Sequence, residues 1–190
     1  MSRRLPPNCG ADLENVLLHN PYQQSFQSAR RLRFCLTCRK IGSMNGTGIY
    51  ICPNCKREHT TNLTAPRIYQ WFMLRAGRRS GKSLIGAHAA REEMAIPNTR
   101  GWVCGPSFKI LHDATMPTLL RLIPPAWVKS WDVENLELGL VNGSTVQFRS
   151  LDDPERGRGQ GLHWLWLDEA AFVAERAWDD VRPSFTQNLG

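Results

Sequence analysis

Apolar and polar positions divide this chain of 190 residues into three regions of different character. Residues 1–30 are polar, and only residues 11–18 have the pattern of a helix. Residues 31–62 hold four of the six cysteines, separated by Gly, Asn, Thr and Lys. Over residues 63–190, short apolar runs alternate with helical stretches, which predicts an α/β domain.

The third region supplies the elements of a mostly parallel sheet with helices on both faces. Residues 68–75 (IYQWFMLR) form an apolar run typical of a buried strand. Asn142-Gly143 between two alternating segments is the strongest short-range signal for a β-hairpin. We expect strands over residues 68–75, 101–105, 136–140, 145–148 and 162–167, and helices over residues 82–94, 108–122 and 170–181.

The charge of the chain favours an acidic partner. Its net charge is +7 and its pI is about 9.4, and nucleic acid is the commonest polyanion that such proteins bind. The alternative is a basic soluble protein without such a partner. No run of 18 apolar residues is present, and the basic N-terminus has no apolar stretch behind it. We therefore expect a cytoplasmic protein, in which paired cysteines hold metal more often than they form disulfides.

Residues 76–83 (AGRRSGKS) match the phosphate-binding pattern G-x-x-x-x-G-K-[ST], except that Ala76 replaces the first glycine. Such a loop surrounds phosphates with backbone N–H groups, which requires small residues and freedom in φ. The lysine reaches the β- and γ-phosphates, and the following hydroxyl ligates Mg²⁺. The sequence therefore predicts an ATP site that uses Ala76, Gly77, Arg78, Arg79, Ser80, Gly81, Lys82 and Ser83.

Two arginines inside this loop, Arg78 and Arg79, leave two interpretations open. Either guanidinium could stabilise negative charge that develops on the transferred phosphoryl group. Either could equally be solvated or paired with a nearby carboxylate.

A second motif is the apolar strand that ends in Asp168 and Glu169. Parallel sheets bind ligands at the carboxyl ends of their strands, where this pair would lie. Asp168 is predicted to hold Mg²⁺, and Glu169 to orient and polarise an attacking water. An acid attracted to a helix N-terminus explains one carboxylate but not a pair that closes a buried strand.

With both motifs in place, the chain resembles the ATPase domain of phage terminase large subunits, which are P-loop NTPases of the RecA/ASCE type. The similarity covers roughly residues 66–190 and depends on the order of residues 76–83 (AGRRSGKS), 140–150 (LVNGSTVQFRS), 154–159 (PERGRG), 167–172 (LDEAAF) and 181–185 (VRPSF). The resemblance assigns Lys82 and Ser83 to the nucleotide and Mg²⁺, Asp168 to Mg²⁺, and Glu169 to catalysis. It also implies an arginine finger at Arg78 or Arg79. The segment 20–24 (NPYQQ) is similar to the element that contacts adenine, with Gln24 as the candidate residue.

The resemblance implies an ATP-hydrolysing subunit that drives double-stranded viral DNA into a capsid. Its implied partners are DNA, a portal protein, a terminase small subunit and further copies of itself in a ring. In the family, a further strand with a Ser/Thr-rich coupling motif and a nuclease domain follow the acidic pair. We therefore expect the sheet of a chain that ends at Gly190 to be incomplete at its C-terminus. Such a chain should bind nucleotide poorly and hydrolyse almost none.

The cysteine module over residues 31–62 is not part of the common family pattern. Cys35 and Cys38, and Cys52 and Cys55, form two C-x-x-C pairs separated by 13 residues. Two such turns supply four thiolates for one tetrahedral Zn²⁺. Disulfides or chance pairs are the alternative. We predict an inserted zinc ribbon whose folding energy comes from the metal and whose surrounding Lys and Arg side chains suit a phosphate backbone.

Two rival functions share some of these features. A RecA-like helicase would carry both nucleotide motifs but does not predict the 140–150 hairpin followed by Arg156 and Arg158. The second rival is a zinc-ribbon protein that binds nucleic acid and whose ATPase half is a non-catalytic remnant. In that protein only the cysteine module would be functional.

Overall fold

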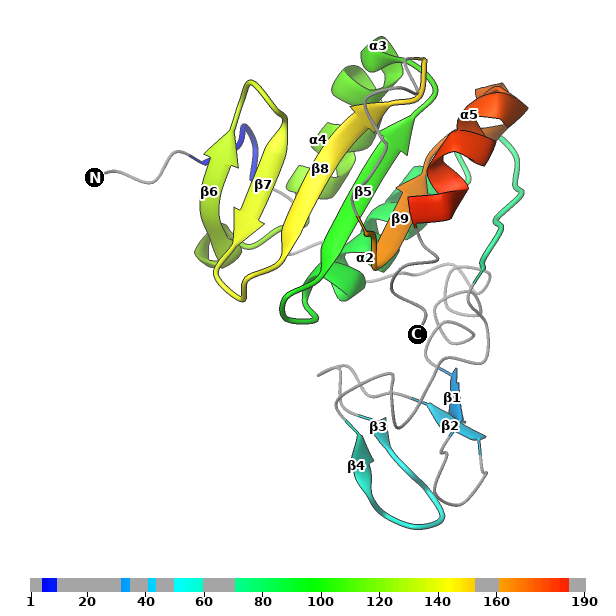
Figure 1. Ribbon diagram of the computed structural model, residues 1–190, viewed down its shortest axis with the longest axis vertical. Coiled ribbons are helices and arrows are strands. Elements are labelled where there is room, and N and C mark those ends of the chain that lie inside the picture. The colour runs from blue at the N-terminus through cyan, green and yellow to red at the C-terminus, as the bar shows by residue number, and fades with distance from the viewer. Residues whose placement is uncertain are drawn as a thin grey trace. The chain divides into compact units, whose positions relative to one another are not determined.

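The computed structural model describes residues 5–9, 32–34, 41–43, 50–59, 71–152 and 161–184. The chain divides into two compact units (Figure 1). One combines Met1–Val16 with Ser83–Gly190, and the other is Leu17–Lys82. The helix expected over residues 11–18 and the candidate Gln24 lie outside the described residues. Among the helices that can be described, none has the length and apolar character needed to span a bilayer.

The larger unit is built on a five-stranded sheet with the order β6-β7-β8-β5-β9. β5 pairs in parallel with β8 on one side and with β9 on the other. β7 is antiparallel to both β8 and β6, so it alone runs against the other four strands (Figure 1). The strands are β5 (Arg100–Gly105), β6 (Val128–Asp132), β7 (Glu137–Leu140), β8 (Thr145–Ser150) and β9 (Trp164–Leu167). The expected mostly parallel α/β sheet is therefore present.

The β7–β8 hairpin forms around the predicted Asn142-Gly143 turn. Gly143 has a φ of +84°, a conformation that glycine adopts without steric cost, and its N–H donates to the Leu140 carbonyl at 3.1 Å. Asn142 secures the turn from the other side, because its amide donates to the carbonyl of Met94 at 3.0 Å. The turn is thus held against the end of the helix that precedes β5.

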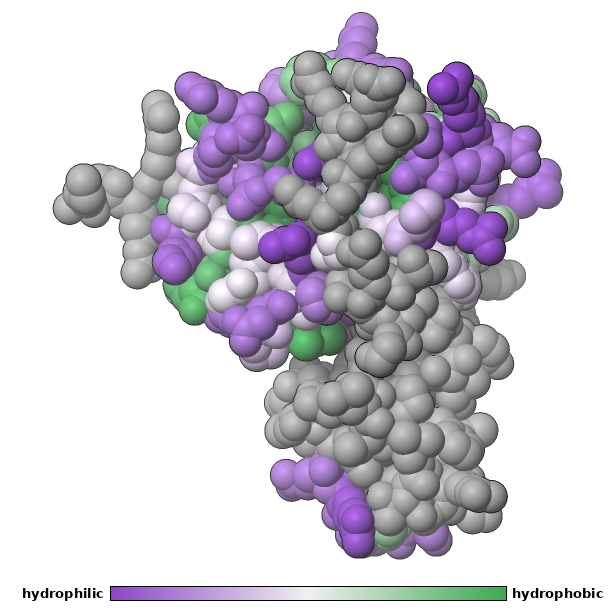
Figure 2. Space-filling view, in the orientation of Figure 1, coloured by the Kyte–Doolittle hydropathy of each residue, from purple (hydrophilic) through white to green (hydrophobic). Residues whose placement is uncertain are grey.

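Helices cover both faces of the sheet, as the sequence predicts (Figure 1). One face carries α2 (Lys82–Met94) and a helical stretch made of α3 (Phe108–Ile110), a π-helical turn (Leu111–Thr115) and α4 (Met116–Leu120). The other face carries α5 (Glu175–Val181). Two apolar clusters fill these layers, a large one under α2 and α4 and a smaller one under α5. On the side that Figure 2 shows, hydrophilic and near-neutral residues dominate the described surface, and hydrophobic residues form small separate groups.

The smaller unit contains two short antiparallel hairpins. β1 (Leu32–Phe34) pairs with β2 (Ile41–Ser43), and β3 (Tyr50–Ile51) pairs with β4 (Glu58–His59). The turn between β3 and β4 is closed by two backbone bonds of 3.0 Å, from the Cys52 N–H to the Arg57 carbonyl and from the Lys56 N–H to the Cys52 carbonyl. This tight turn carries the second C-x-x-C pair.

Three expectations need correction. The strand expected over residues 68–75 is wrong for residues 71–75, which have no regular secondary structure; Met73 is 92% exposed. An apolar run favours burial, but a strand also needs a neighbouring strand for its backbone groups, and residues 71–75 pair with none of the described strands. The helix expected over residues 170–181 is broken into a 3₁₀ turn (Ala170–Phe172) and α5. β6 was not expected, because its charged and polar residues hide the strand pattern.

Candidate functional site

The first residues of α2 and the end of β9 meet through a single hydrogen bond. The Ser83 hydroxyl donates to Asp168 Oδ1 at 3.0 Å, although the two residues are 85 positions apart. Ser83 is the second residue of α2, and Asp168 directly follows β9. Both were predicted from sequence as ligands of one cation, and the fold brings them into direct contact. A hydroxyl and a carboxylate on adjacent elements are oxygen ligands of the kind that Mg²⁺ prefers.

Asp168 is held by a second hydroxyl that sequence reasoning did not find. Thr115 Oγ1 donates to Asp168 Oδ2 at 3.0 Å, so each carboxylate oxygen has its own donor. Thr115 is fully buried, and Asp168 is only 6% exposed. No motif or spacing marks Thr115 in the sequence. The π-helical turn that carries it is visible only in three dimensions.

The backbone of Asp168 is anchored to the neighbouring strand. Its N–H donates to the Cys104 carbonyl at 2.9 Å, which extends the parallel β5–β9 pairing beyond the last residue of β9. The Cys104 side chain is fully buried, and burial raises the pKa of its thiol to about 12. This cysteine is therefore a protonated core residue, as its position on a strand suggests.

Glu169 adopts a backbone conformation that is unfavourable for its residue type. Its φ of 49° and ψ of 43° place it in the left-handed region, before the 3₁₀ turn Ala170–Phe172. The Phe172 N–H donates to the Glu169 carbonyl at 3.0 Å and stabilises this bend. Strained residues of this kind cost about 1–3 kcal/mol and concentrate at functional sites. The bend sends the chain away from β9 immediately after the buried Asp168, and Glu169 itself stays half-buried.

The loop that precedes α2 contains two residues with a positive φ. Gly81 has a φ of +81° and Arg79 a φ of +59°. A Cβ on Gly77 would meet no atom within 4 Å, so the loop has open space at this position. The Lys82 ammonium donates to the Gly77 carbonyl at 3.1 Å and closes the loop on itself. Arg78 and Arg79 are both exposed.

Ser80 places a buried hydroxyl in the same loop. Its Oγ is buried and has no hydrogen-bond partner among the residues that the structure describes. A buried hydroxyl without a partner is costly, and phosphate oxygens or water are suitable acceptors for it. The Ser80 hydroxyl and the Lys82 ammonium are donors of the kind that phosphate oxygens accept from.

The close approach of α2 to β9 explains why Ser83 reaches Asp168. Gly86 lies one turn after Ser83, and a Cβ there would fall 2.2 Å from Nε1 of Trp166. Only a residue without a side chain permits this helix–strand distance. Trp166 precedes Asp168 by two positions, so the contact fixes the helix against the segment that carries the carboxylate.

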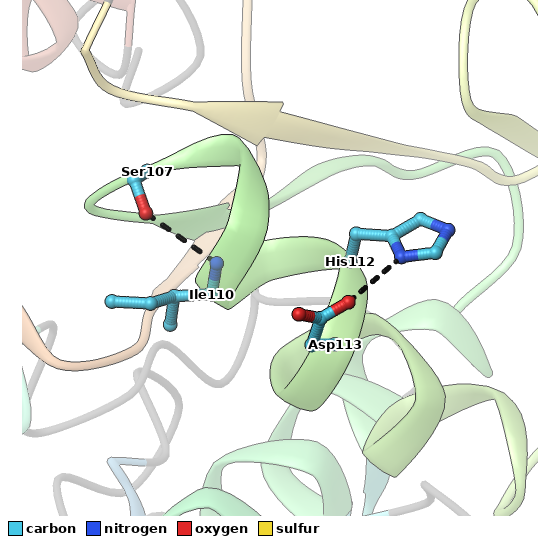
Figure 3. Close-up of polar contacts among 4 residues, drawn as sticks. All are labelled: Ser107, Ile110, His112 and Asp113. Atoms are coloured by element: carbon cyan, nitrogen blue, oxygen red, sulfur yellow. Dashed lines mark hydrogen bonds and ion pairs between the residues drawn. The ribbon is translucent and has the colours of Figure 1, made fainter.

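The segment after β5 begins with a capped helix and continues into the π-helical turn (Figure 3). Ser107 Oγ accepts from the Ile110 N–H at 3.4 Å, which caps α3. His112 Nδ1 lies 3.1 Å from Asp113 Oδ1, but these side chains are 57% and 58% exposed. Such a solvated pair contributes little to stability. Of the hydroxyls and charges on this turn, the buried Thr115 is the one that contacts the Ser83–Asp168 site.

The predicted zinc site falls partly outside the described residues. Cys35 and Cys38 are not described, while Cys52 is buried and Cys55 half-buried in the turn between β3 and β4. Within the part of the chain that can be described, no group of three or more His, Cys, Asp or Glu side chains lies close enough to hold a metal. The four-cysteine zinc site stays a prediction.

Comparison with solved proteins finds phage large terminases. The ATPase domain of the large terminase of Thermus phage P74-26 has a TM-score of 0.48 and 27% identity, covering 60% of this chain and 54% of that domain. A mutant of the same domain has a TM-score of 0.48 and 24% identity, with the same shares. The large terminase of a thermophilic bacteriophage, solved in complex with ADP, has a TM-score of 0.49 and 17% identity, covering 58% of this chain and 29% of that protein.

The chain therefore spans about half or less of the proteins to which it is similar. No protein-family model and no curated protein sequence matches it.

Proposed function

We propose that this chain is the ATP-hydrolysing part of a terminase-like motor that drives double-stranded DNA into a viral capsid in the host cytoplasm. The observation that carries the ATPase proposal is the 3.0 Å hydrogen bond between Ser83 and Asp168. It joins the helix that begins at the phosphate-binding motif to the strand that ends in the acidic pair. Two motifs recognised separately in the sequence thus converge on one point, which chance matches would not require.

Each residue of the site has a defined task in this proposal. The N–H groups of residues 77–81 and the Lys82 ammonium hold the phosphates of ATP. Ser83 and Asp168 hold Mg²⁺, which when bound neutralises phosphate charge. Glu169, at the bend after β9, accepts a proton from the attacking water and orients it towards the γ-phosphate. Arg78 or Arg79 stabilises negative charge that develops on the transferred group.

The motor and its partners rest on the sequence resemblance, and the charge of the chain agrees with them. A net charge of +7 suits a DNA partner, and the cysteine module, with Zn²⁺ bound, would present further basic side chains to the phosphate backbone. A portal protein, a terminase small subunit and a ring of identical subunits complete the proposed assembly. A RecA-like helicase remains the second candidate, since it would use the same Ser83–Asp168 arrangement.

Nucleotide binding is the first test. We expect the 190-residue chain to bind ATP weakly, so the titration should extend to millimolar ATP, with and without Mg²⁺. Lys82→Ala should weaken binding by roughly tenfold or more, because a charge-assisted hydrogen bond contributes about 1.5–3 kcal/mol. Lys129→Ala is the matched control, because Lys129 is an exposed lysine on β6. Equal losses in the two variants would contradict the assignment of the loop.

The second test measures ATP hydrolysis by the longest protein that the gene encodes. Glu169→Gln should preserve ATP binding and abolish turnover, because the carboxylate acts on water and not on the nucleotide. Equal turnover in the variant and the wild type would remove Glu169 from catalysis.

DNA dependence separates the two candidate motors. A packaging ATPase should be stimulated by blunt double-stranded DNA and should not separate its strands. Release of a labelled strand from a forked duplex during ATP hydrolysis would favour the helicase instead.

A further inference from the structure

We propose that Thr115 is a positioning residue that sets the orientation of the Asp168 carboxylate for Mg²⁺. The inference rests on the proposed nucleotide site and adds to it a residue that neither motif contains. Thr115 does not contact the nucleotide in this proposal. It acts through Asp168.

The geometry gives each carboxylate oxygen a separate role. Ser83, at the start of α2, donates to Oδ1, and Thr115 donates to Oδ2, each at 3.0 Å. A carboxylate with a donor on only one oxygen can turn about its Cβ–Cγ bond. The buried Thr115 hydroxyl opposes that rotation and fixes the plane of the carboxylate. One oxygen is therefore kept towards Ser83, the second predicted ligand of the cation.

Burial makes this contact consequential. Asp168 is 6% exposed and Thr115 fully buried, so water has little access to replace the bond. A buried carboxylate that loses a donor keeps an unsatisfied oxygen, which favours its reorientation. Such a reorientation would move the other oxygen away from its position next to Ser83. Partners of metal ligands commonly change metal affinity by about 10- to 100-fold when they are removed.

The helix that carries Thr115 departs from α-helical geometry at this site. Leu111–Thr115 form a π-helical turn between α3 and α4, and the Met116 N–H donates to the Leu111 carbonyl five residues earlier. Such turns insert one extra residue into a helix and are frequent at functional sites. The turn leaves the Thr115 hydroxyl facing Asp168.

A second threonine on the same stretch shows the ordinary alternative. Thr118 Oγ1 donates to the Ala114 carbonyl four residues earlier, at 2.7 Å, and this hydrogen bond is exposed to solvent. This local bond is the usual one for a threonine inside a helix. The Thr115 hydroxyl instead donates its hydrogen bond to Asp168, 53 positions away. The contrast makes Thr118 a matched control on the same element.

The test measures how ATP binding by the 190-residue chain depends on Mg²⁺ concentration. Thr115→Val keeps the shape and removes the hydroxyl, and we expect it to raise the Mg²⁺ concentration for half-maximal binding by about tenfold. Binding of ATP without Mg²⁺ should not change. Thr115→Ser, which keeps the hydroxyl, and Thr118→Val should both behave as the wild type.

Each alternative outcome is distinguishable. If folded Thr115→Val needs no more Mg²⁺ than the wild type for half-maximal ATP binding, Thr115 does not position Asp168. An equal loss of ATP binding with and without Mg²⁺ would overturn the positioning role as well. So would a Thr115→Ser variant that needs as much Mg²⁺ as Thr115→Val. If the valine variant does not fold, Thr115→Ala compared with Thr115→Ser gives the same contrast. A wild-type chain that binds no nucleotide at millimolar ATP would overturn the proposed function itself, and this role with it.

Discussion

Replacing Gly86 by alanine should destabilise the protein, although the same change in most helices is stabilising. Gly86 lies inside α2, where alanine is intrinsically better by about 1 kcal/mol. The added Cβ would, however, lie 2.2, 2.4 and 2.8 Å from Nε1, Cε2 and Cζ2 of Trp166. These three atoms belong to one rigid ring, so no small rotation of a flexible tip relieves the contact.

The magnitude follows from these two opposing effects. Contacts between carbon atoms become favourable only at about 3.5–4.0 Å, so the ring or the helix must shift by more than 1 Å. Overpacking of this severity lies at the upper end of the usual cost, about 3 kcal/mol. Subtracting the gain in helix propensity leaves a net loss of about 2 kcal/mol in the free energy of unfolding.

Urea denaturation followed by circular dichroism measures this loss. Gly77→Ala is the control, because a Cβ at Gly77 meets no atom within 4 Å and should change stability by less than about 0.5 kcal/mol. In a Trp166→Ala background the ring is gone, and Gly86→Ala should then stabilise by about 1 kcal/mol. A stabilising Gly86→Ala in the wild-type background would refute the close approach of α2 and β9. It would also remove the explanation offered for the Ser83–Asp168 contact.

Three further predictions follow from other parts of the chain. Glu169→Gly should raise the free energy of unfolding by about 1 kcal/mol, because it relieves a left-handed backbone, while ATP hydrolysis is lost; Glu169→Ala should give no such stabilisation. Elemental analysis of reduced protein should find about one Zn²⁺ per chain. The metal should be absent from Cys52→Ser and retained in Cys9→Ser. A wild-type protein without zinc would contradict the predicted zinc ribbon. Burial first, and then the charge of Arg91, lower the pKa of His88 below 6.5, and its Nε2 has no hydrogen-bond partner among the described residues. The unfolded chain therefore binds the extra proton, so stability should fall as pH drops below about 6.5, and this component should vanish in His88→Leu.

Several elements are determined by local sequence. α2 begins at Lys82 and ends at Met94, as predicted, because the phosphate loop precedes it and Pro97 follows it. The β7–β8 hairpin forms where Asn142-Gly143 supplies the turn. Two of the three residues that meet at the candidate site, Ser83 and Asp168, were also identified from their motifs. These features depend on backbone preferences and on spacing over a few residues, which a sequence displays directly.

Tertiary structure decided the rest. Residues 71–75 have a strand-like sequence, but pairing needs an edge that no local pattern provides. β6 forms despite its polar residues because β7 offers it such an edge. Thr115 joins the site only because a π-helical turn brings it to a carboxylate 53 residues away. Local preference selects the conformation of a segment, whereas hydrogen bonds between distant segments depend on where the whole chain places them.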